Sequence, residues 1–207
     1  MVRQCGDSFF SMSDASQLKQ HYRENLSKKR KKLTPSERDI FSNQIIYFLT
    51  EYLSTLSEPN GVLQLLVYHA LPNEVDTSAL FHDERFEVYV PRMLPELQME
   101  WLAVGRSTVW KPMDFGVQEP DDGVLWKKSE LKTVLVAPLL GFDRMGNRLG
   151  MGKGYFDRWL ETHAGSLDEQ LGLAFSCQEL PKVPAEQHDA PLSKIITEHG
   201  VIACPTI

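Results

Sequence analysis

The sequence predicts an α/β fold, a layered single domain in which helices flank a mainly parallel sheet. Two apolar runs, residues 62–68 and 133–140, are almost free of polar side chains, which is typical of strands buried on both faces. Helical patterns alternate with these and other strand candidates, and such alternation indicates a parallel sheet. The 207 residues are enough for one domain, which we expect to span residues 1–207 with a loose tail at 1–13.

The helices are predicted from capping signals and apolar spacing. The clearest start is Thr34, because Pro35 occupies the first helical position and Glu37 completes a capping box. Apolar residues at helical spacing extend this helix to about residue 56. An earlier helix is expected to open near Asp14. Shorter helices are predicted at residues 77–82 and 155–162.

Further strands are predicted at residues 86–90, 99–104, 171–175 and 200–203. Residues 111–128 are rich in Pro, Asp, Gly and Trp, so we expect an ordered loop there. The basic run at residues 28–32 has no interleaved aromatic side chains, and we interpret it as a solvated helix end.

Composition argues against several classes of protein. A formal charge of −6 provides no positive field that would gather nucleic acid. No apolar run approaches the roughly 20 residues that cross a bilayer, so no membrane partner is expected. Cys5, Cys177 and Cys204 are too few and too far apart for a disulfide framework or a zinc site. We expect a protein of the reducing cytoplasm that acts as a monomer.

The most informative segment is the glycine-rich stretch at residues 141–157, which follows the second apolar run. Its five glycines allow positive φ angles and a close approach to a ligand. Consecutive amide groups before a helix N-terminus form a concavity that suits an anion. Arg148 and Lys153 add full positive charges, and Asp157 can hold the divalent ion that a polyphosphate carries. The segment predicts a polyphosphate site, with a flexible turn bearing solvated cations as the open alternative.

The glycine stretch fits neither of the two common nucleotide motifs. It is not a Walker A loop, because Gly154 follows Lys153 where Ser or Thr is required, and its glycine spacing differs from the dinucleotide fingerprint. Residues 146–157, preceded by residues 137–143, instead resemble the signature of the 5-formyltetrahydrofolate cyclo-ligase family, also called methenyltetrahydrofolate synthetases.

The resemblance extends beyond the glycine stretch. Lys19 and Arg23 lie one helical turn apart, as in the family's Lys-x-x-x-Arg pattern. Glu74 follows the first buried strand as the family's substrate-binding glutamate does, and Asp189 is similar to another family landmark. The resemblance covers about residues 19–207.

The resemblance implies an ATP- and Mg²⁺-dependent conversion of 5-formyltetrahydrofolate to 5,10-methenyltetrahydrofolate, with release of ADP and phosphate. In the family mechanism the formyl oxygen attacks the γ-phosphate, and N10 of the folate then displaces phosphate from the resulting imidate. The family's fold is similar to that of some sugar-phosphate isomerases and CoA transferases. Arg148 and Lys153 are the expected catalytic residues, since they neutralise charge during phosphoryl transfer.

The resemblance also implies the binding residues. Those expected for ATP are Lys19, Arg23, Arg148, Leu149, Gly150, Met151, Gly152, Lys153, Gly154, Tyr155 and Phe156. Those expected for the folate are Glu74, Met151, Gly152, Lys153, Gly154 and Tyr155. The expected Mg²⁺ ligands are Asp157 and Asp189.

Two positions depart from common family patterns. Met151 stands where some members have arginine, and Phe156 replaces a frequent second tyrosine. These departures leave open a protein of the same fold that binds folate or nucleotide without catalysis. An isomerase or CoA-transfer enzyme is a third possibility, but Lys19 and Arg23 argue against it.

Overall fold

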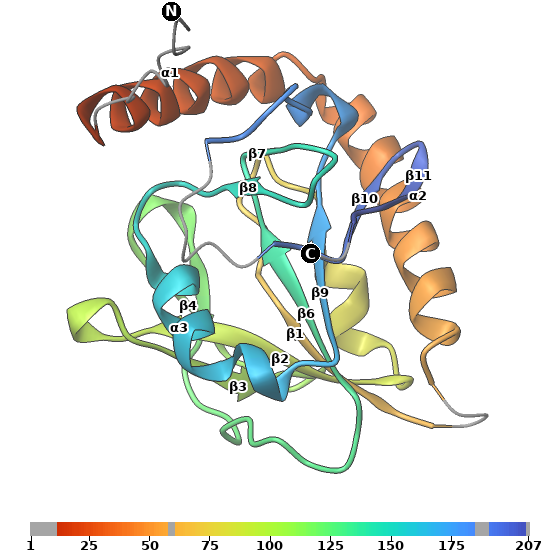
Figure 1. Cartoon of the computed structure of the whole chain (residues 1–207). Helices are drawn as coiled ribbons and strands as arrows, with labels where there is room; N and C mark the ends of the chain where they lie inside the picture. The colour runs from red at the N-terminus through yellow and green to blue at the C-terminus, as the bar shows by residue number, and fades with distance from the viewer. Residues whose placement is uncertain (1–11, 58–60, 185–190, 206–207) are drawn as a thin grey trace, which may run out of the picture.

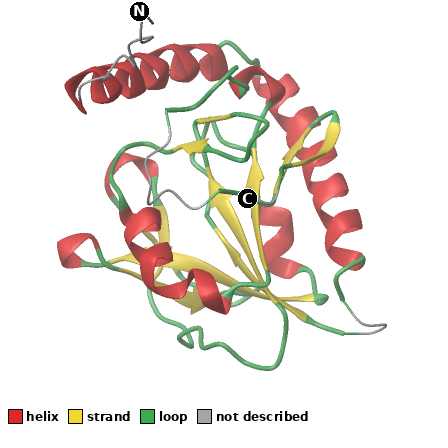
Figure 2. Ribbon diagram, viewed as in Figure 1, coloured by secondary structure: helices red, strands yellow, loops and turns green. Residues whose placement is uncertain are grey.

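The computed structural model describes residues 12–57, 61–184 and 191–205. Within these ranges a central sheet is accompanied by three α-helices, shown in Figures 1 and 2. The helices are α1 (Met12–Lys31), α2 (Pro35–Ser54) and α3 (Tyr155–His163). Five 3₁₀ turns lie between the larger elements: η1 (Ser78–His82), η2 (Pro95–Leu97), η3 (Asp114–Gly116), η4 (Ala164–Ser166) and η5 (Ser176–Gln178).

The main sheet has seven strands in the order β11-β10-β9-β6-β1-β2-β3. The strands are β1 (Leu63–Val67), β2 (Phe86–Met93), β3 (Met99–Ala103), β6 (Thr133–Pro138), β9 (Glu169–Leu173), β10 (Lys194–Thr197) and β11 (Gly200–Ala203). Neighbours from β10 to β2 are parallel, while the edge strands β3 and β11 pair antiparallel. The predicted α/β class is confirmed, with a mixed and mostly parallel sheet.

The order of the strands places a topological switch point between β1 and β6. From β1 the chain adds β2 and β3 on one side, and after returning to β6 it adds β9, β10 and β11 on the other. Loops leaving β1 and β6 therefore diverge in opposite directions. In such sheets the crevice between these loops, at the carboxyl ends of the strands, is the usual ligand site.

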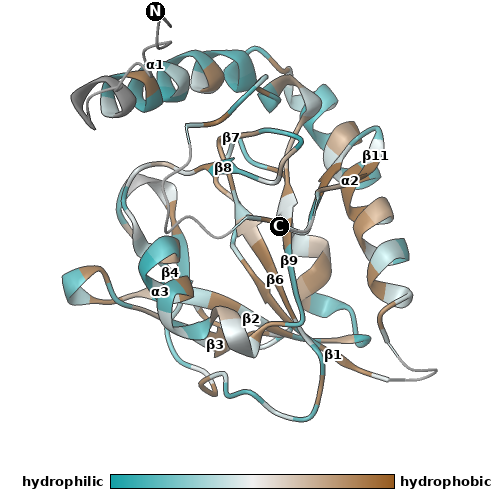
Figure 3. Ribbon diagram, viewed as in Figure 1, coloured by the Kyte–Doolittle hydropathy of each residue, from teal (hydrophilic) through white to brown (hydrophobic). Residues whose placement is uncertain are grey.

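The central strands consist largely of hydrophobic residues, shown in brown in Figure 3, and these residues form two buried clusters. Along β6, Val134 and Val136 pack in the cluster that includes α2, whereas Leu135 and Ala137 pack in the cluster that includes α3. The two helices therefore lie on opposite faces of the sheet. In β6, every residue except the last is buried, which explains the uninterrupted apolar run in this part of the sequence.

Helix α1 lies across the carboxyl ends of the strands and above the glycine stretch (Figure 1). Its anchor is Leu26, which is 1% exposed and packs with Leu140, Leu149 and Leu180 in a small separate core. A Cβ on Gly141 would come within 2.5 Å of a Leu26 methyl carbon, so a larger residue in β7 would force the Leu26 side chain to shift. None of the described helices is both long and apolar enough to cross a membrane.

Most predicted elements are confirmed, with small shifts at their ends. The capping box at Thr34 and Glu37 is present and starts α2. The predicted tail, residues 1–13, lies outside the described residues except for residues 12 and 13, which begin α1.

Three parts of the chain differ from the prediction. Residues 111–128 are predicted as a loop, but the structure has two short antiparallel strands in this region, β4 (Trp110–Pro112) and β5 (Gln118–Pro120). The glycine stretch begins with a hairpin of β7 (Gly141–Phe142) and β8 (Arg148–Leu149). The strand β10 was not predicted.

Candidate functional site

Three segments that carry predicted site residues meet at the switch point of the sheet. The glycine stretch leaves the carboxyl end of β6, and the loop that carries Glu74 leaves the carboxyl end of the neighbouring β1. Helix α1 contacts β7 and η5, so it covers this edge of the sheet. The sequence thus brings three separate segments to the place where parallel sheets bind ligands.

Asp143 organises the hairpin from which the glycine loop emerges. Its side chain is buried, and its carboxylate accepts hydrogen bonds from the backbone N–H groups of Met145 at 2.9 Å, Asn147 at 3.2 Å and Val183 at 2.8 Å. The side-chain amide of Asn147 donates two more hydrogen bonds to the Asp143 carboxylate, at 3.2 and 3.0 Å. A carboxylate can satisfy several donors at once, which sets the tight turn and the direction in which β8 leads into the loop.

Arg23 joins helix α1 to the glycine loop. Its Nε donates a hydrogen bond to the Gly150 carbonyl oxygen at 3.0 Å. Its guanidinium also lies over Gly152, where a Cβ would come within 3.1 Å of Arg23 Cζ. Gly152 and Gly154 have φ angles of +89° and +79°, in the left-handed region that favours glycine. Arg23, one of the residues expected to bind ATP, thus contacts the glycine loop directly.

Arg148 and Asp157 form an ion pair across the base of the loop. The Arg148 side chain on β8 is 6% exposed, whereas Asp157, in the first turn of α3, is 44% exposed. An acidic group at this position also complements the helix dipole. The pair links the strand before the loop to the helix after it, so the loop is held at both ends.

A cavity of about 390 Å³ lies between α1 and the glycine loop. Its polar lining comes from one stripe of α1, and Leu140 and Met151 form the opposite wall. The lining residues of α1 are Gln20, Arg23, Glu24, Ser27, Lys28 and Lys31. Three cations and one carboxylate therefore face this space, which gives it a net positive lining.

The interpretation of the basic run at residues 28–32 as a solvated helix end was wrong for Arg30. Its side chain is 6% exposed and pairs with Glu74, whose side chain is 9% exposed, at 3.6 Å from Nη1 to Oε1. Arg30 lies seven residues after Arg23 and four after Leu26, which is the spacing of one helix face. That spacing distinguishes Arg30 from its exposed neighbours, whereas charge alone does not.

Glu74 is held at the end of the loop that follows β1. Its Oε2 accepts a hydrogen bond from the Leu71 N–H at 3.1 Å. Burial raises the pKa of Glu74, while the Arg30 charge and the Leu71 hydrogen bond oppose this shift. The same loop is attached to β1 through Tyr68, whose hydroxyl donates to the Val75 carbonyl at 3.1 Å.

The remaining predicted residues differ in their surroundings. Lys153 is exposed in the loop and Lys19 is half-buried on α1. The Leu149 side chain is buried in the small core beneath α1. Tyr155 and Phe156 pack at the edge of the core under α3, with the Phe156 ring 5.9 Å from that of Trp101.

The expected metal ligands are only partly within the described residues. Asp189 lies outside them. Across the described ranges, no three or more His, Cys, Asp or Glu side chains form a group that could hold a metal ion. Of the two expected ligands, only Asp157 lies within the described residues.

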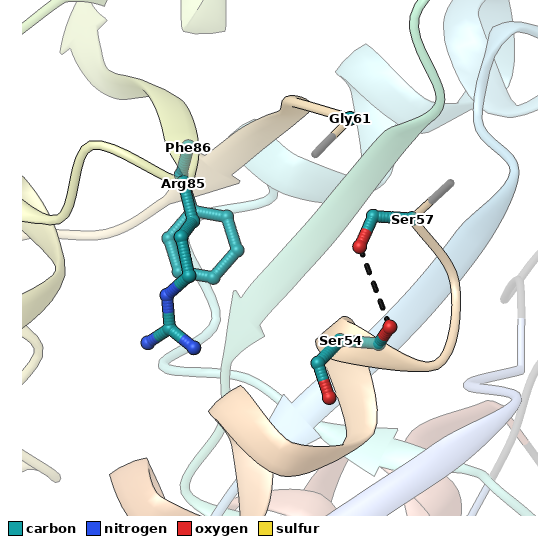
Figure 4. A pocket seen from close by; sticks show the side chains of 5 residues that line it. All are labelled: Ser54, Ser57, Gly61, Arg85 and Phe86. Atoms are coloured by element: carbon teal, nitrogen blue, oxygen red, sulfur yellow. Dashed lines mark hydrogen bonds between the residues drawn. The ribbon is translucent and has the colours of Figure 1, made fainter. Parts of the chain in front are cut away.

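A second cavity, of about 210 Å³, lies at the opposite edge of the sheet. Figure 4 shows its lining of Ser54, Ser57, Gly61, Arg85 and Phe86, at the amino ends of β1 and β2. Arg85 is already paired with Asp83 at 2.6 Å. This cavity lies at the amino ends of the strands, whereas the glycine stretch lies at their carboxyl ends. The cavity is therefore not part of the candidate site.

Comparison with known proteins agrees with this geometry. Residues 15–198 match the model of the 5-formyltetrahydrofolate cyclo-ligase family. The chain is 30% identical to the 5-formyltetrahydrofolate cyclo-ligase of Haemophilus influenzae, over 87% of this chain and 98% of that protein. It is 25% identical to the mouse 5-formyltetrahydrofolate cyclo-ligase, over 72% of this chain and 80% of that protein.

A solved structure shares the fold. The NMR structure of the Aquifex aeolicus 5,10-methenyltetrahydrofolate synthetase matches with a TM-score of 0.73 and 26% identity, over 92% of this chain and 94% of that one. Sequence, site geometry and fold lead to the same conclusion: the chain belongs to the 5-formyltetrahydrofolate cyclo-ligase family and is an enzyme with that activity.

Proposed function

We propose that residues 150–154 and helix α1 together bind the triphosphate of ATP, while the loop after β1 binds the pterin of 5-formyltetrahydrofolate. The observation that carries this proposal is the hydrogen bond from Arg23 Nε to the Gly150 carbonyl at 3.0 Å. It brings a basic helix against a loop whose backbone is open to a ligand. The two binding regions meet at the switch point, so the two substrates would lie side by side.

The positively lined cavity under α1 is the proposed place of the nucleotide. Arg23, Lys28 and Lys31 face it from the helix, and Met151 faces it from the loop. Backbone N–H groups of the loop and the N-terminus of α3 supply donors for phosphate oxygens. Arg148 and Lys153 are the proposed catalytic residues, because charge spreads over the γ-phosphate oxygens during transfer. Met151 provides no charge here, so its neighbours carry this role.

Glu74 and Tyr155 are the proposed folate ligands. An ionised carboxylate accepts hydrogen bonds on both oxygens, which matches the amino and ring N–H donors of a pterin. Tyr155 offers an aromatic face and a hydroxyl at the start of α3. Glu74 lies on the β1 side of the crevice and Tyr155 on the β6 side, so the pterin would bridge them.

The chemistry requires alignment above all. The formyl oxygen attacks the γ-phosphorus, the bond to the β-phosphate oxygen breaks, and ADP leaves. N10 then attacks the formyl carbon, the carbon–oxygen bond breaks, phosphate leaves, and N10 loses its proton. Phosphorylation thus converts a poor leaving group into a good one. The residues of the loop hold the two reacting groups together and neutralise charge in a site sheltered by α1.

Mg²⁺ fits the donor chemistry of the loop. This ion is usually held by one or two carboxylates together with phosphate oxygens, and Asp157 is a partly exposed carboxylate beside the proposed phosphate site. Asp189 is the proposed second ligand. When bound, the ion would neutralise phosphate charge.

The test of the proposal is the formation of methenyl product by the whole chain. Methenyl absorbance and ADP are followed after 5-formyltetrahydrofolate and Mg²⁺–ATP are added. We expect Arg23→Gln to raise mainly the KM for ATP and Glu74→Gln to raise mainly the KM for the folate. Lys29→Gln removes an exposed charge from the same helix and is the matched control.

Two outcomes would contradict the proposal. A folded chain that binds ATP and folate without releasing ADP would be a binding protein on this fold. Unchanged KM values in both site variants would place the substrates elsewhere. We further propose a single-domain cytoplasmic monomer, whose mass light scattering would measure directly.

A further inference from the structure

Arg30 stands out among the cations of α1 because it is buried. It lies in the last turn of the helix, and its side chain points under α1 toward Glu74, at 3.6 Å. Lys29 and Lys31, on either side of it, are exposed. A buried ion pair between two segments holds them together. Here the pair joins helix α1, which we propose binds ATP, to the loop after β1, which we propose binds the folate.

The Arg30 side chain is not fully satisfied by the fold. Its Nε is buried and has no hydrogen-bond partner. Buried polar groups are nearly always paired, and one that is left unpaired costs stability. A fold selected for stability alone would favour an apolar residue at this position, so the arginine points to a role in the site.

The Glu74 carboxylate depends on this cation. A carboxylate that is 9% exposed tends to take up a proton unless an opposite charge lies nearby. In agreement with this, burial raises the pKa of Glu74 and the Arg30 charge counteracts the rise. Only the ionised form accepts hydrogen bonds on both oxygens, which is the form that a pterin's N–H donors require.

We propose that Arg30 is a positioning residue, which holds Glu74 as an oriented carboxylate for the pterin and ties helix α1 to the folate-binding loop. This inference rests on the proposed role of Glu74. Arg30 acts through Glu74 and does not itself touch the reacting atoms. The orientation comes from two sides, because the Leu71 N–H donates to Oε2 while Arg30 faces Oε1.

Other titratable groups surround the pair and have to be separated from Glu74 in any pH experiment. They are Lys29 on α1, Tyr68 and His69 at the end of β1, Asp76 in the same loop, Cys177 in η5 and Glu198 after β10. All of them remain when Arg30 or Glu74 is replaced. The pH effect that belongs to Glu74 is therefore the part that disappears in Glu74→Gln.

The experiment compares Arg30→Gln, Arg30→Lys, Glu74→Gln and the double variant, with Lys29→Gln as control. KM values for 5-formyltetrahydrofolate and for ATP are measured between pH 6 and 9. In Arg30→Gln we expect the folate KM to rise roughly tenfold or more at neutral pH, because the Glu74 carboxylate loses the charge that keeps it ionised and oriented. The KM should fall again as the pH increases, because Glu74 then ionises without help.

The remaining variants make the inference specific. Arg30→Lys keeps the charge and should restore most of the folate KM and its pH profile. The double variant should bind folate no worse than Glu74→Gln alone, and the KM for ATP should change less than twofold in Arg30→Gln. Thermal unfolding is measured for each protein. If Arg30→Gln does not fold, the same measurements on Arg30→Met decide, because Met also removes the charge and is apolar enough for the buried position.

The proposed role of Glu74 in folate binding and the inferred role of Arg30 would be contradicted by different results. A normal folate KM in Glu74→Gln would remove Glu74 from the folate site and with it the proposed function of this loop. A raised KM in Glu74→Gln together with a normal KM in Arg30→Gln would overturn the inference about Arg30 alone. Equal loss for both substrates, with no shift of the pH profile, would indicate that Arg30 serves only the fold.

Discussion

Gly152 has no side chain, and this leaves room for the Arg23 guanidinium to pack against the glycine loop. A Cβ at this position would lie 3.1 Å from Arg23 Cζ, which is closer than an ordinary van der Waals contact. The φ angle of +89° at Gly152 adds a second reason for glycine, since other residues rarely adopt it. Both the backbone conformation and the close Arg23 contact therefore favour glycine at this position.

Replacing Gly152 by alanine should therefore weaken both stability and nucleotide binding. We expect a loss of about 1–2 kcal/mol from the left-handed backbone. The KM for ATP should also rise as the methyl group displaces Arg23. Thermal unfolding and ATP titration measure the two effects.

Gly150→Ala is the control for the stability effect. A Cβ at Gly150 would meet no heavy atom within 4 Å, and its φ lies outside the left-handed region. Equal unfolding temperatures for the two variants would contradict the expected cost of the left-handed backbone at residue 152.

The spacing of charged residues along α1 predicts which helix face each one occupies, but not which residue it pairs with. The spacing of Lys19 and Arg23 places them on one side of a helix, and Arg23 does reach the loop. The same spacing rule applied to Arg30 would have separated it from its exposed neighbours. The partner could not be predicted in this way, because Glu74 is far away in the sequence and comes near Arg30 only in the folded chain.

Among the secondary-structure elements, the hairpin β7–β8 determines the direction of the glycine loop. The hairpin is very short, with two residues in each strand, so its own ladder contributes little. Buried Asp143 replaces the missing strand pairing by accepting three backbone hydrogen bonds. The element is thus stabilised by one side chain.

We expect Asp143→Ala to destabilise the protein by about 3 kcal/mol, because several buried N–H donors lose their acceptor. For a chain of this size that loss corresponds to a decrease in Tm of roughly 6–12 °C. The KM for ATP should rise as well, since the loop follows directly. Differential scanning calorimetry measures the first effect and steady-state kinetics the second.

Arg144→Gln is a suitable comparison, because Arg144 is the next residue and its side chain is 70% exposed. We expect little change in its Tm. If both variants melt at the wild-type temperature, Asp143 does not hold the hairpin.

The elements that sequence patterns predicted well are those with strong local signals. Helix α2 has its capping box, and β1 and β6 have long apolar runs. The hairpin β7–β8 and the strand β10 were missed because they are short and depend on distant contacts. The antiparallel direction of β3 and β11 follows from how the chain returns at each edge, which hydrophobic periodicity does not encode.

At the scale of the whole molecule, a polar network joins α2 to two strands of the sheet. Tyr52 of α2 donates to Glu169 of β9 at 2.9 Å, and Ser193 donates to the same carboxylate. Lys194 of β10 lies 3.5 Å from it. Burial alone would raise the pKa of Glu169, but these hydrogen bonds and the Lys194 charge outweigh it and lower the pKa below 4.5.

The lowered pKa predicts how stability depends on acid. Since the folded protein holds Glu169 ionised at lower pH than the unfolded chain does, the unfolded chain takes up the proton first as the pH falls. The contribution of Glu169 is therefore complete above its unfolded pKa, near 4.5, and is lost as the pH falls through the folded value. Urea unfolding at pH 7 and at pH 3 should show a larger difference between wild type and Glu169→Gln at pH 7. Glu130→Gln, at an exposed position, should differ little from wild type at either pH. Parallel pH curves for wild type and Glu169→Gln would mean that the α2–sheet network does not depend on this charge.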